Sequence, residues 1–283
     1  MSVTQPWTWT LLRAGAFRLD GGSMFGLIPR TIWERWSPPD GRNRISLHAN
    51  CVLLRRGDEV VLIEAGFGDK WSDKERAIYD LERRTIVDAL REQGVEPGAV
   101  STIVLSHLHF DHAAGLTAEQ EPGMPGSATA LFPNARVVVQ RREWVDACAN
   151  RSTMTRTYLP THLAPVEGQL RLVDGLTAVS DQLWVEPLPG HTWGMQLVGF
   201  RDGQGTIVFG GDIMPTTAHV HRSASMGYDM LPHEVMLQKG RFLRRAAEEG
   251  WRLVLSHEPD SPIQRVEPDG KDWFRFVAPE PVS

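Results

Sequence analysis

The chain has 283 residues, 41% of them hydrophobic and 23% charged, so it can bury a sizeable core within one large α/β domain or two fused halves. Its formal net charge of −5 and its pI near 6.1 leave no basic excess. The sequence also contains no Lys/Arg cluster that could contact a phosphate backbone over several nucleotides, so we expect no nucleic-acid partner. We treat residues 1–283 as a single domain.

The apolar runs of the sequence are short. None approaches the roughly 18 residues of a membrane-spanning helix, and residues 1–19 lack the basic start and apolar run of a signal peptide. A soluble cytoplasmic protein with no membrane partner is therefore expected. Cys51 and Cys148 both lie in apolar stretches, which predicts buried, reduced thiols.

Strands and helices alternate in the predicted secondary structure. The runs rich in β-branched residues predict strands at 51–54, 60–63, 102–105, 136–139, 183–185, 196–200, 206–209 and 252–255. The clearest helices are predicted at 84–93, closed by Gly94, and at 233–249, which follows Pro232 and is closed by Gly250. Such interleaving predicts α/β layers with sheet beneath helix.

Two segments interrupt this pattern. Residues 20–44 carry Gly, Pro and several large apolar side chains without a clean period, which predicts a long ordered loop or arm. Residues 119–134 are rich in Gly, Pro and small residues and predict a surface loop.

Three histidines and an aspartate crowd into six positions directly after the predicted strand at 102–105: His107, His109, Asp111 and His112. Side chains of this kind so close together repel one another or go unsatisfied unless a cation organises them. Imidazole and carboxylate groups suit zinc, iron or manganese. The four offer more ligands than one tetrahedral ion with an open position uses. In an extended turn His107 and His109 face one ion, leaving Asp111 and His112 for a second.

Later strand ends repeat the arrangement of an apolar run followed by a ligand-type residue. His191 follows Pro189 and Gly190 after one strand, Asp212 follows two glycines after another, and His257 ends a third. Each of these residues alone is weak evidence for a site, but together they repeat one pattern, and active sites of α/β proteins collect at such strand ends. The two glycines predict close backbone approach with the Asp212 carboxylate projecting from the strand terminus.

The motifs at 107–112, 190–192, 211–212 and 256–257 together resemble the metallo-β-lactamase superfamily in order and spacing, over roughly residues 45–260. The resemblance implies an αβ/βα sandwich with its site at the edge between two halves. It also implies that His107, His109 and His191 bind one metal ion, that Asp111, His112 and His257 bind the other, and that Asp212 bridges them. One position departs from the family pattern: Glu64 stands where an aspartate is usual.

The fuller resemblance is to the YtnP-like quorum-quenching lactonases of this superfamily, with methyl parathion hydrolase as a more distant relative. It is carried by residues 20–29, 107–117, 132–135 and 212–219. The implied reaction is ring opening of N-acyl homoserine lactones. A cation pair lowers the pKa of a shared water towards about 7 and so supplies hydroxide as nucleophile. We expect two divalent ions, zinc first, with manganese, cobalt or iron as alternatives. Asp111 and Asp212 are the expected catalytic carboxylates, and Asp111 could also carry a proton to the leaving group.

Some lactonases place a substrate-binding tyrosine shortly after the bridging aspartate, where this chain has Pro215. Tyr228, His219 or His221 are candidates to replace it. The apolar wall for an acyl tail is expected from the arm at 20–44, which could equally pack on its own domain or form a homodimer contact. The arm residues we expect to bind substrate are Met24, Phe25, Leu27, Ile28, Trp33 and Trp36.

Other functions are alternatives to the lactonase interpretation. An aryl esterase or phosphotriesterase needs no change in the metal centre. A di-iron redox module or an iron persulfide dioxygenase would keep metals but change the chemistry, and a non-catalytic binding protein usually lacks a ligand, whereas all seven positions are filled here.

Overall fold

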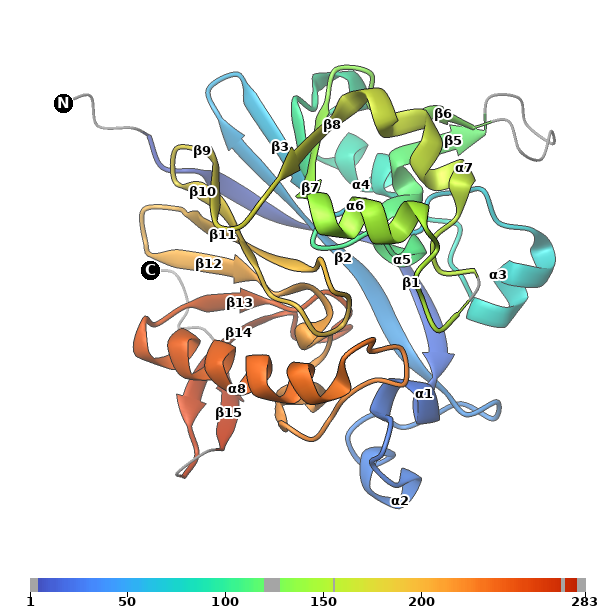
Figure 1. Cartoon of the computed structure of the whole chain (residues 1–283), viewed down its shortest axis with the longest axis vertical. Coiled ribbons are helices and arrows are strands. Elements are labelled where there is room, and N and C mark those ends of the chain that lie inside the picture. Colours follow the sequence, from blue (N-terminus) through green and yellow to red (C-terminus); the bar gives the residue numbers. More distant parts are fainter. Residues whose placement is uncertain (1–4, 120–127, 155, 271–272, 279–283) are drawn as a thin grey trace.

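Two β-sheets stacked face to face form the centre of the computed structural model, which describes residues 5–119, 128–154, 156–270 and 273–278 (Figure 1). The first sheet has the order β1-β2-β3-β4-β7-β8. From β3 to β8 neighbouring strands are parallel, whereas β1 and β2 are antiparallel. Its strands are β1 (Thr8–Asp20), β2 (Arg44–Arg56), β3 (Glu59–Ile63), β4 (Thr102–Val104), β7 (Arg136–Gln140) and β8 (Leu170–Val173).

The second sheet comes from the C-terminal half of the chain, in the order β15-β14-β13-β12-β11-β10-β9. Only β12 and β13 pair in parallel. Its strands are β9 (Thr177–Ser180), β10 (Leu183–Pro187), β11 (Gln196–Arg201), β12 (Thr206–Phe209), β13 (Arg252–Val254), β14 (Ile263–Pro268) and β15 (Phe274–Val277).

The inner faces of both sheets share one apolar layer. In β2, Val52 and Leu54 face this layer while Cys51 and Leu53 face the opposite side, because successive strand side chains alternate. Helix α4 (Ile86–Glu92) packs on the outer face of the first sheet, and α8 (Pro232–Glu248) covers the second (Figure 1). This is the αβ/βα sandwich that the motifs implied.

The remaining helices and the small sheet lie around this sandwich. They are α1 (Gly21–Phe25), α2 (Arg30–Trp33), α3 (Asp73–Tyr79), α5 (Phe110–Ala113), α6 (Arg141–Cys148), α7 (Pro160–Leu163) and the hairpin of β5 (Thr117–Glu119) and β6 (Ala128–Ala130). Short 3₁₀ turns are η1 (Pro97–Ala99), η2 (Ala114–Leu116), η3 (Ala164–Gln169), η4 (Gly211–Ile213) and η5 (Thr217–Val220).

All eight predicted strands and both predicted helices are present, with ends that differ by a few residues, except that the strand at 51–54 is part of the much longer β2. Three expectations need correction. The arm at 20–44 contains α1 and α2, and its Phe25 and Trp33 are buried. The expected loop at 119–134 contains β6, while 120–127 lie outside the described residues. Cys51 is buried as predicted, but Cys148 is exposed because it ends α6 on the solvent side.

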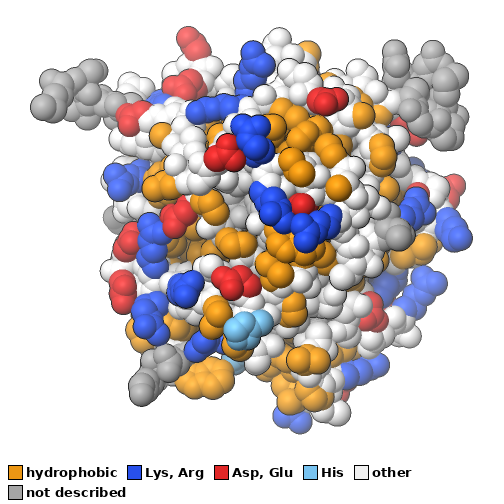
Figure 2. All heavy atoms as spheres, viewed as in Figure 1, with side chains coloured by type: hydrophobic (Ala, Val, Ile, Leu, Met, Phe, Trp, Pro, Cys, Tyr) orange, Lys and Arg blue, Asp and Glu red, His pale blue; other side chains and the backbone are white. Residues whose placement is uncertain are grey.

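The described residues contain no helix long and apolar enough to cross a membrane. On the face shown in Figure 2, Lys and Arg side chains are interspersed with acidic and hydrophobic ones.

Candidate metal centre and pocket

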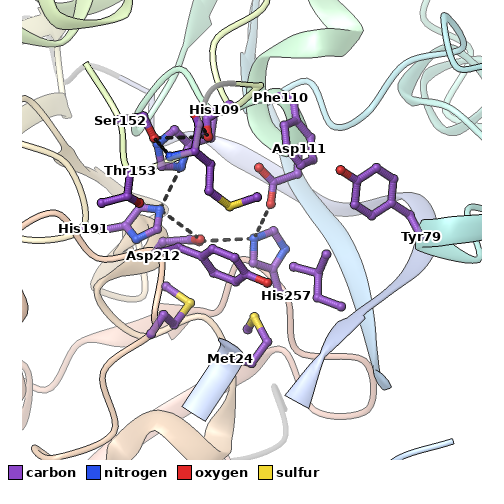
Figure 3. A pocket seen from close by; sticks show the side chains of 15 residues that line it. Met24, Tyr79, His109, Phe110, Asp111, Ser152, Thr153, His191, Asp212 and His257 are labelled. Atoms are coloured by element: carbon purple, nitrogen blue, oxygen red, sulfur yellow. Dashed lines mark hydrogen bonds and ion pairs between the residues drawn. The ribbon is translucent and has the colours of Figure 1, made fainter. Parts of the chain in front are cut away.

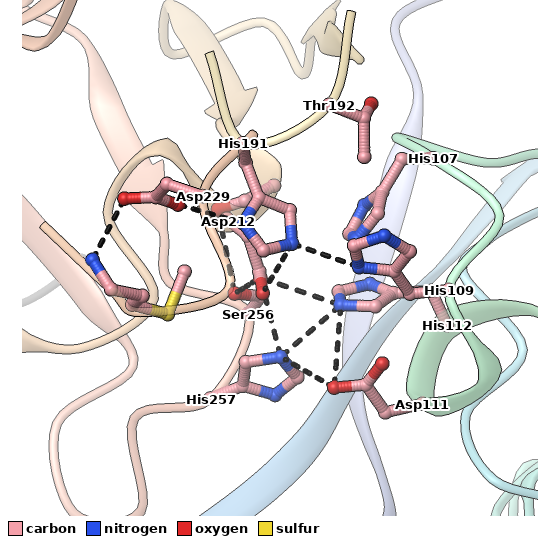
Figure 4. Close-up of polar contacts among 12 residues, drawn as sticks. His107, His109, Asp111, His112, His191, Thr192, Asp212, Asp229, Ser256 and His257 are labelled. Carbon is pink, nitrogen blue, oxygen red and sulfur yellow. Dashed lines mark hydrogen bonds and ion pairs between the residues drawn. The ribbon is translucent and has the colours of Figure 1, made fainter. Parts of the chain in front are cut away.

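The seven predicted ligand residues meet at one edge of the sandwich, where strands of both sheets end. His107 to His112 follow β4, His191 follows β10, Asp212 follows β12 and His257 follows β13. Backbone hydrogen bonds join these segments, including Gln196 N to Ser106 O at 2.9 Å and His257 N to Pro215 O at 2.9 Å. Residues more than 100 positions apart therefore form one cluster (Figure 4).

The cluster divides into two groups, and within each group the potential ligand atoms lie within 4.8 Å of one another. The first group is His107, His109 and His191, and the second is Asp111, His112, Asp212 and His257. In the first, Nδ1 of His109 lies 2.9 Å from Nε2 of His191. In the second, the Nε2 atoms of His112 and His257 are 3.1 Å apart.

Asp212 lies between the two groups. Its Oδ1 is 3.3 Å from Nε2 of His112 and 3.2 Å from Nε2 of His257. Its other oxygen, Oδ2, is 3.6 Å from Nε2 of His191. Each carboxylate oxygen thus faces a different group. Asp111 belongs to the second group, with Oδ2 3.5 Å from Nε2 of His257.

The donor set fits two bound cations. In four of the five histidines Nδ1 contacts a group outside the cluster, which leaves Nε2 pointing into the cluster. The partners of Nδ1 are Ser106 Oγ for His107, Glu64 for His112, Asp229 for His191 and the His48 carbonyl for His257. Metal-binding histidines are held in this way. The Nε2 of His107 is buried with no hydrogen-bond partner, which is costly unless an ion takes its lone pair.

The charges around these imidazoles act in opposite directions. Burial lowers the pKa of His107 and His109 well below the usual range. Burial also opposes charge on His112, but Asp212, Asp111 and Glu64 raise its pKa well above that range. Burial opposes charge on Asp212 as well, but His257 and His112 hold the pKa of this carboxyl well below its ordinary value. The site therefore favours an ionised Asp212 and a positive charge beside it.

Glu64, the departure from the family pattern, lies beneath the second group. Its Oε2 is 3.0 Å from Nδ1 of His112, and its Oε1 accepts the Ser106 N–H at 2.7 Å. Its backbone lies in the left-handed region, with a φ of 66°, which is uncommon for a residue other than glycine. The residue orients a predicted ligand.

The two glycines before Asp212 approach neighbouring segments closely, as predicted. Gly211 has a φ of +56°, and a Cβ there would lie 2.8 Å from Cβ of Ser106. Any other residue at 211 would push the strand end away from the 106–112 turn.

A pocket with about 580 Å³ of empty space, open to solvent, lies above the cluster (Figure 3). Five predicted ligands line it: His109, Asp111, His191, Asp212 and His257. The remaining lining residues are Leu19, Met24, Tyr79, Phe110, Ser152, Thr153, Met154, Thr157, Met226 and Tyr228. Figure 3 shows the Tyr79 hydroxyl pointing towards Asp111.

Of the predicted substrate-binding residues, Met24 and Tyr228 line this pocket. The others, Phe25, Leu27, Ile28, Trp33, Trp36 and His219, are absent from its lining. Phe25 is stacked between Trp33 at 5.4 Å and His219 at 4.9 Å. His219 is fully buried and contacts the Met24 carbonyl and the Thr216 hydroxyl, at 2.9 and 2.8 Å. These aromatic residues fix the arm on which Met24 stands.

Several functional residues escaped the sequence reasoning. Asp229 holds His191 at 2.8 Å, and Ser256 donates to Asp212 at 2.8 Å. The turn at 152–157 supplies one pocket wall. A single Asp or Ser in a loop gives no sequence pattern from which a role could be predicted. Ser256 could have been found, because it stands in the 256–257 motif directly before the predicted ligand His257.

Comparison with known families gives one model, described as the metallo-beta-lactamase superfamily, that matches residues 45–257. One curated relative is an N-acyl homoserine lactonase of Bacillus thuringiensis, 28% identical over 165 residues, which are 54% of this chain and 58% of the relative. Metallo-beta-lactamase domain-containing protein 1 of Homo sapiens is 31% identical over 176 residues, 62% of this chain and 54% of that protein. The matches therefore span just over half the length of these relatives.

Solved structures match over nearly the whole chain. A probable metal-dependent hydrolase from Staphylococcus aureus has a TM-score of 0.87 and 25% identity, covering 99% of this chain and 100% of that one. The dizinc quorum-quenching lactonase AidC, in complex with a product, has a TM-score of 0.80 and 17% identity, covering 99% and 97%. At that identity the second match speaks for the fold alone.

Proposed function

We propose that this chain, which belongs to the metallo-beta-lactamase superfamily, is a dinuclear metal-dependent hydrolase that opens N-acyl homoserine lactones. The membership confirms the resemblance inferred from the sequence motifs. The observation that carries the proposal is the division of seven ligand-type side chains into two groups, with one oxygen of Asp212 directed at each.

In this proposal His107, His109 and His191 hold one ion, Asp111, His112 and His257 hold the other, and Asp212 serves both. Two bound cations would activate water as a nucleophile and polarise the carbonyl of the substrate. Zinc suits the nitrogen-rich first group, whereas manganese, cobalt and iron accept the same donors.

The protein's own groups then orient the reactants. Asp111 lies at the pocket floor, where its carboxylate can hold the attacking water and pass a proton to the leaving oxygen. The Tyr228 phenol lines the same pocket, and burial raises its pKa to about 12, so it stays protonated at neutral pH. A protonated phenol can donate a hydrogen bond to the substrate carbonyl, which is the task left open by Pro215.

The acyl chain of the substrate would lie against the apolar wall of the pocket. Leu19, Met24 and Met226 come from β1, the arm and the loop before α8, and Phe110 completes the wall. Apolar lining with few polar groups is typical of small-molecule sites. The curated relatives named as N-acyl homoserine lactonases support a substrate with this head group and tail.

A homodimer contact through the arm, one of the alternatives left open by the sequence, stays a proposal; it is supported by Leu27, Ile32 and Trp36, which are 93%, 44% and 38% exposed. Sedimentation of the wild-type protein and of Leu27→Asp would test it. A wild-type monomer would contradict it.

The experiment for the activity compares kcat/KM for C6 to C12 N-acyl homoserine lactones, p-nitrophenyl esters and paraoxon-like phosphotriesters at matched metal loading. Lactones should be turned over most efficiently. Efficient turnover of either other class with lactonase rates at the solution background would refute the lactonase proposal and leave the metal centre standing.

A further inference from the structure

Glu143, near the start of α6, has a completely buried carboxylate that accepts three hydrogen bonds. The Leu108 N–H donates to Oε1 at 3.0 Å, and the Tyr158 hydroxyl donates to the same oxygen at 3.1 Å. The Thr192 hydroxyl donates to Oε2 at 2.5 Å. Burial raises the pKa of Glu143, whereas these three donors favour its ionised form.

Two of the three donors belong to the segments that carry the three-histidine group. Leu108 stands between His107 and His109, and Thr192 follows His191 directly. Figure 4 shows Thr192 beside His191 and His107. The ring of Tyr158, the third donor, lies 5.1 Å from the ring of His109. One carboxylate therefore links segments more than 80 residues apart in sequence.

Gly194 allows this link. A Cβ at position 194 would lie 2.2 Å from the backbone nitrogen of Glu143 and 2.6 Å from its Cβ. Any larger residue would separate the turn after His191 from the start of α6. Thr192, in the 190–192 motif, and Gly194, two positions further on, have no role as ligands, and both serve the contact with Glu143.

A second buried glutamate offers a matched comparison. The backbone N–H groups on either side of His107 donate hydrogen bonds to different carboxylates: that of Ser106 to Glu64 and that of Leu108 to Glu143. Glu64 also contacts His112, at 3.0 Å, and so belongs to the second group of ligands. Both glutamates are essentially inaccessible, with 1% and 0% exposure.

We infer that Glu143 is a positioning residue for the three-histidine metal site, which it assembles by fixing the 107–109 turn against the loop of His191. The inference rests on the proposed dinuclear centre. Replacing the carboxylate by an apolar side chain leaves three buried donors unsatisfied and frees the two segments. Changes in the groups that hold metal ligands typically weaken metal binding by roughly 10- to 100-fold.

The test measures zinc affinity by chelator competition and zinc stoichiometry by native mass spectrometry. The variants His191→Ala and His257→Ala each disable one group and so assign the two affinities. Glu143→Leu should weaken the ion of the three-histidine group about tenfold or more and leave the other ion nearly unchanged. Glu143→Gln, which can still accept from Leu108, should lose less. Glu64→Gln should show the reverse selectivity.

Unchanged affinities in Glu143→Leu would overturn the inference, as would equal weakening of both ions with a lower melting temperature of the metal-free protein. If Glu143→Leu does not fold, Glu143→Gln must still weaken the three-histidine ion more than the other for the inference to stand. A wild-type protein that binds fewer than two ions would overturn the dinuclear centre itself, which separates the two failures.

Discussion

Ser256 Oγ donates a hydrogen bond of 2.8 Å to Oδ1 of Asp212, the carboxylate oxygen that also faces Nε2 of His257 at 3.2 Å. The hydroxyl therefore fixes the rotation of the only carboxylate that faces both ligand groups in the described part of the chain.

Asp212→Ala should accordingly lose both ions, because each group loses a ligand oxygen. Ser256→Ala keeps the carboxylate but releases its rotation, so zinc affinity should fall by roughly tenfold with both ions retained at saturation. Native mass spectrometry at fixed free zinc distinguishes the two patterns. An Asp212→Ala protein with two tightly bound ions would show that this residue does not serve both.

The two phenols of the pocket should differ in effect. Tyr228→Phe removes the proposed hydrogen bond to the substrate carbonyl, which should lower kcat/KM about five- to tenfold, since a hydrogen bond is worth roughly 1–1.5 kcal/mol. The control is Tyr79→Phe, which keeps the ring that packs 5.5 Å from Phe110. Equal rates for wild type and Tyr228→Phe would exclude the phenol from the reaction.

Met24 should influence chain-length preference. Met24→Ala removes apolar surface from the pocket wall, so KM should rise more for C12 than for C6 lactones. Leu27→Ala is the matched control, because Leu27 lies three residues away, is 93% exposed and does not line the pocket. It should leave the ratio of KM values for C12 and C6 lactones unchanged. A uniform change in KM across the series would argue against contact between Met24 and the acyl chain.

Lys239 makes stability depend on pH. The side chain is 1% exposed, its Nζ donates to the Ala224 carbonyl, and burial lowers its pKa from 10.5 to about 8. Between these pH values the unfolded chain binds more protons than the folded one, so the folded state gains stability as the pH rises. Below pH 8 the burial of the charge costs about 3 kcal/mol.

The stability of Lys239→Met relative to wild type should therefore decrease by about 2–3 kcal/mol from pH 7 to pH 10, measured by urea unfolding of the metal-free proteins. Exposed Lys74 on α3 provides the control, Lys74→Met. A pH-independent difference for Lys239→Met would contradict the lowered pKa.

The seven clustered residues could be predicted from the sequence because four of them lie within six positions of the chain and the others follow predicted strands. The residues that hold them could not, since Glu143 and Asp229 act on segments 35 and 38 positions away and lie in no motif. β1 escaped detection because its 13 residues show no regular alternation of burial. The aromatic residues of the arm were expected at the pocket, but composition does not specify the direction in which a side chain points: Phe25 stacks between Trp33 and His219 instead.

Titration of the metal-free protein with zinc, followed by lactone hydrolysis, tests the central claim most directly. Activity should be absent after verified metal removal, should rise with added zinc and should level off at two equivalents per chain, since we propose that each of the two groups of side chains holds one ion. Full activity in the metal-free protein, or a plateau at one equivalent with no second bound ion, would contradict the dinuclear account.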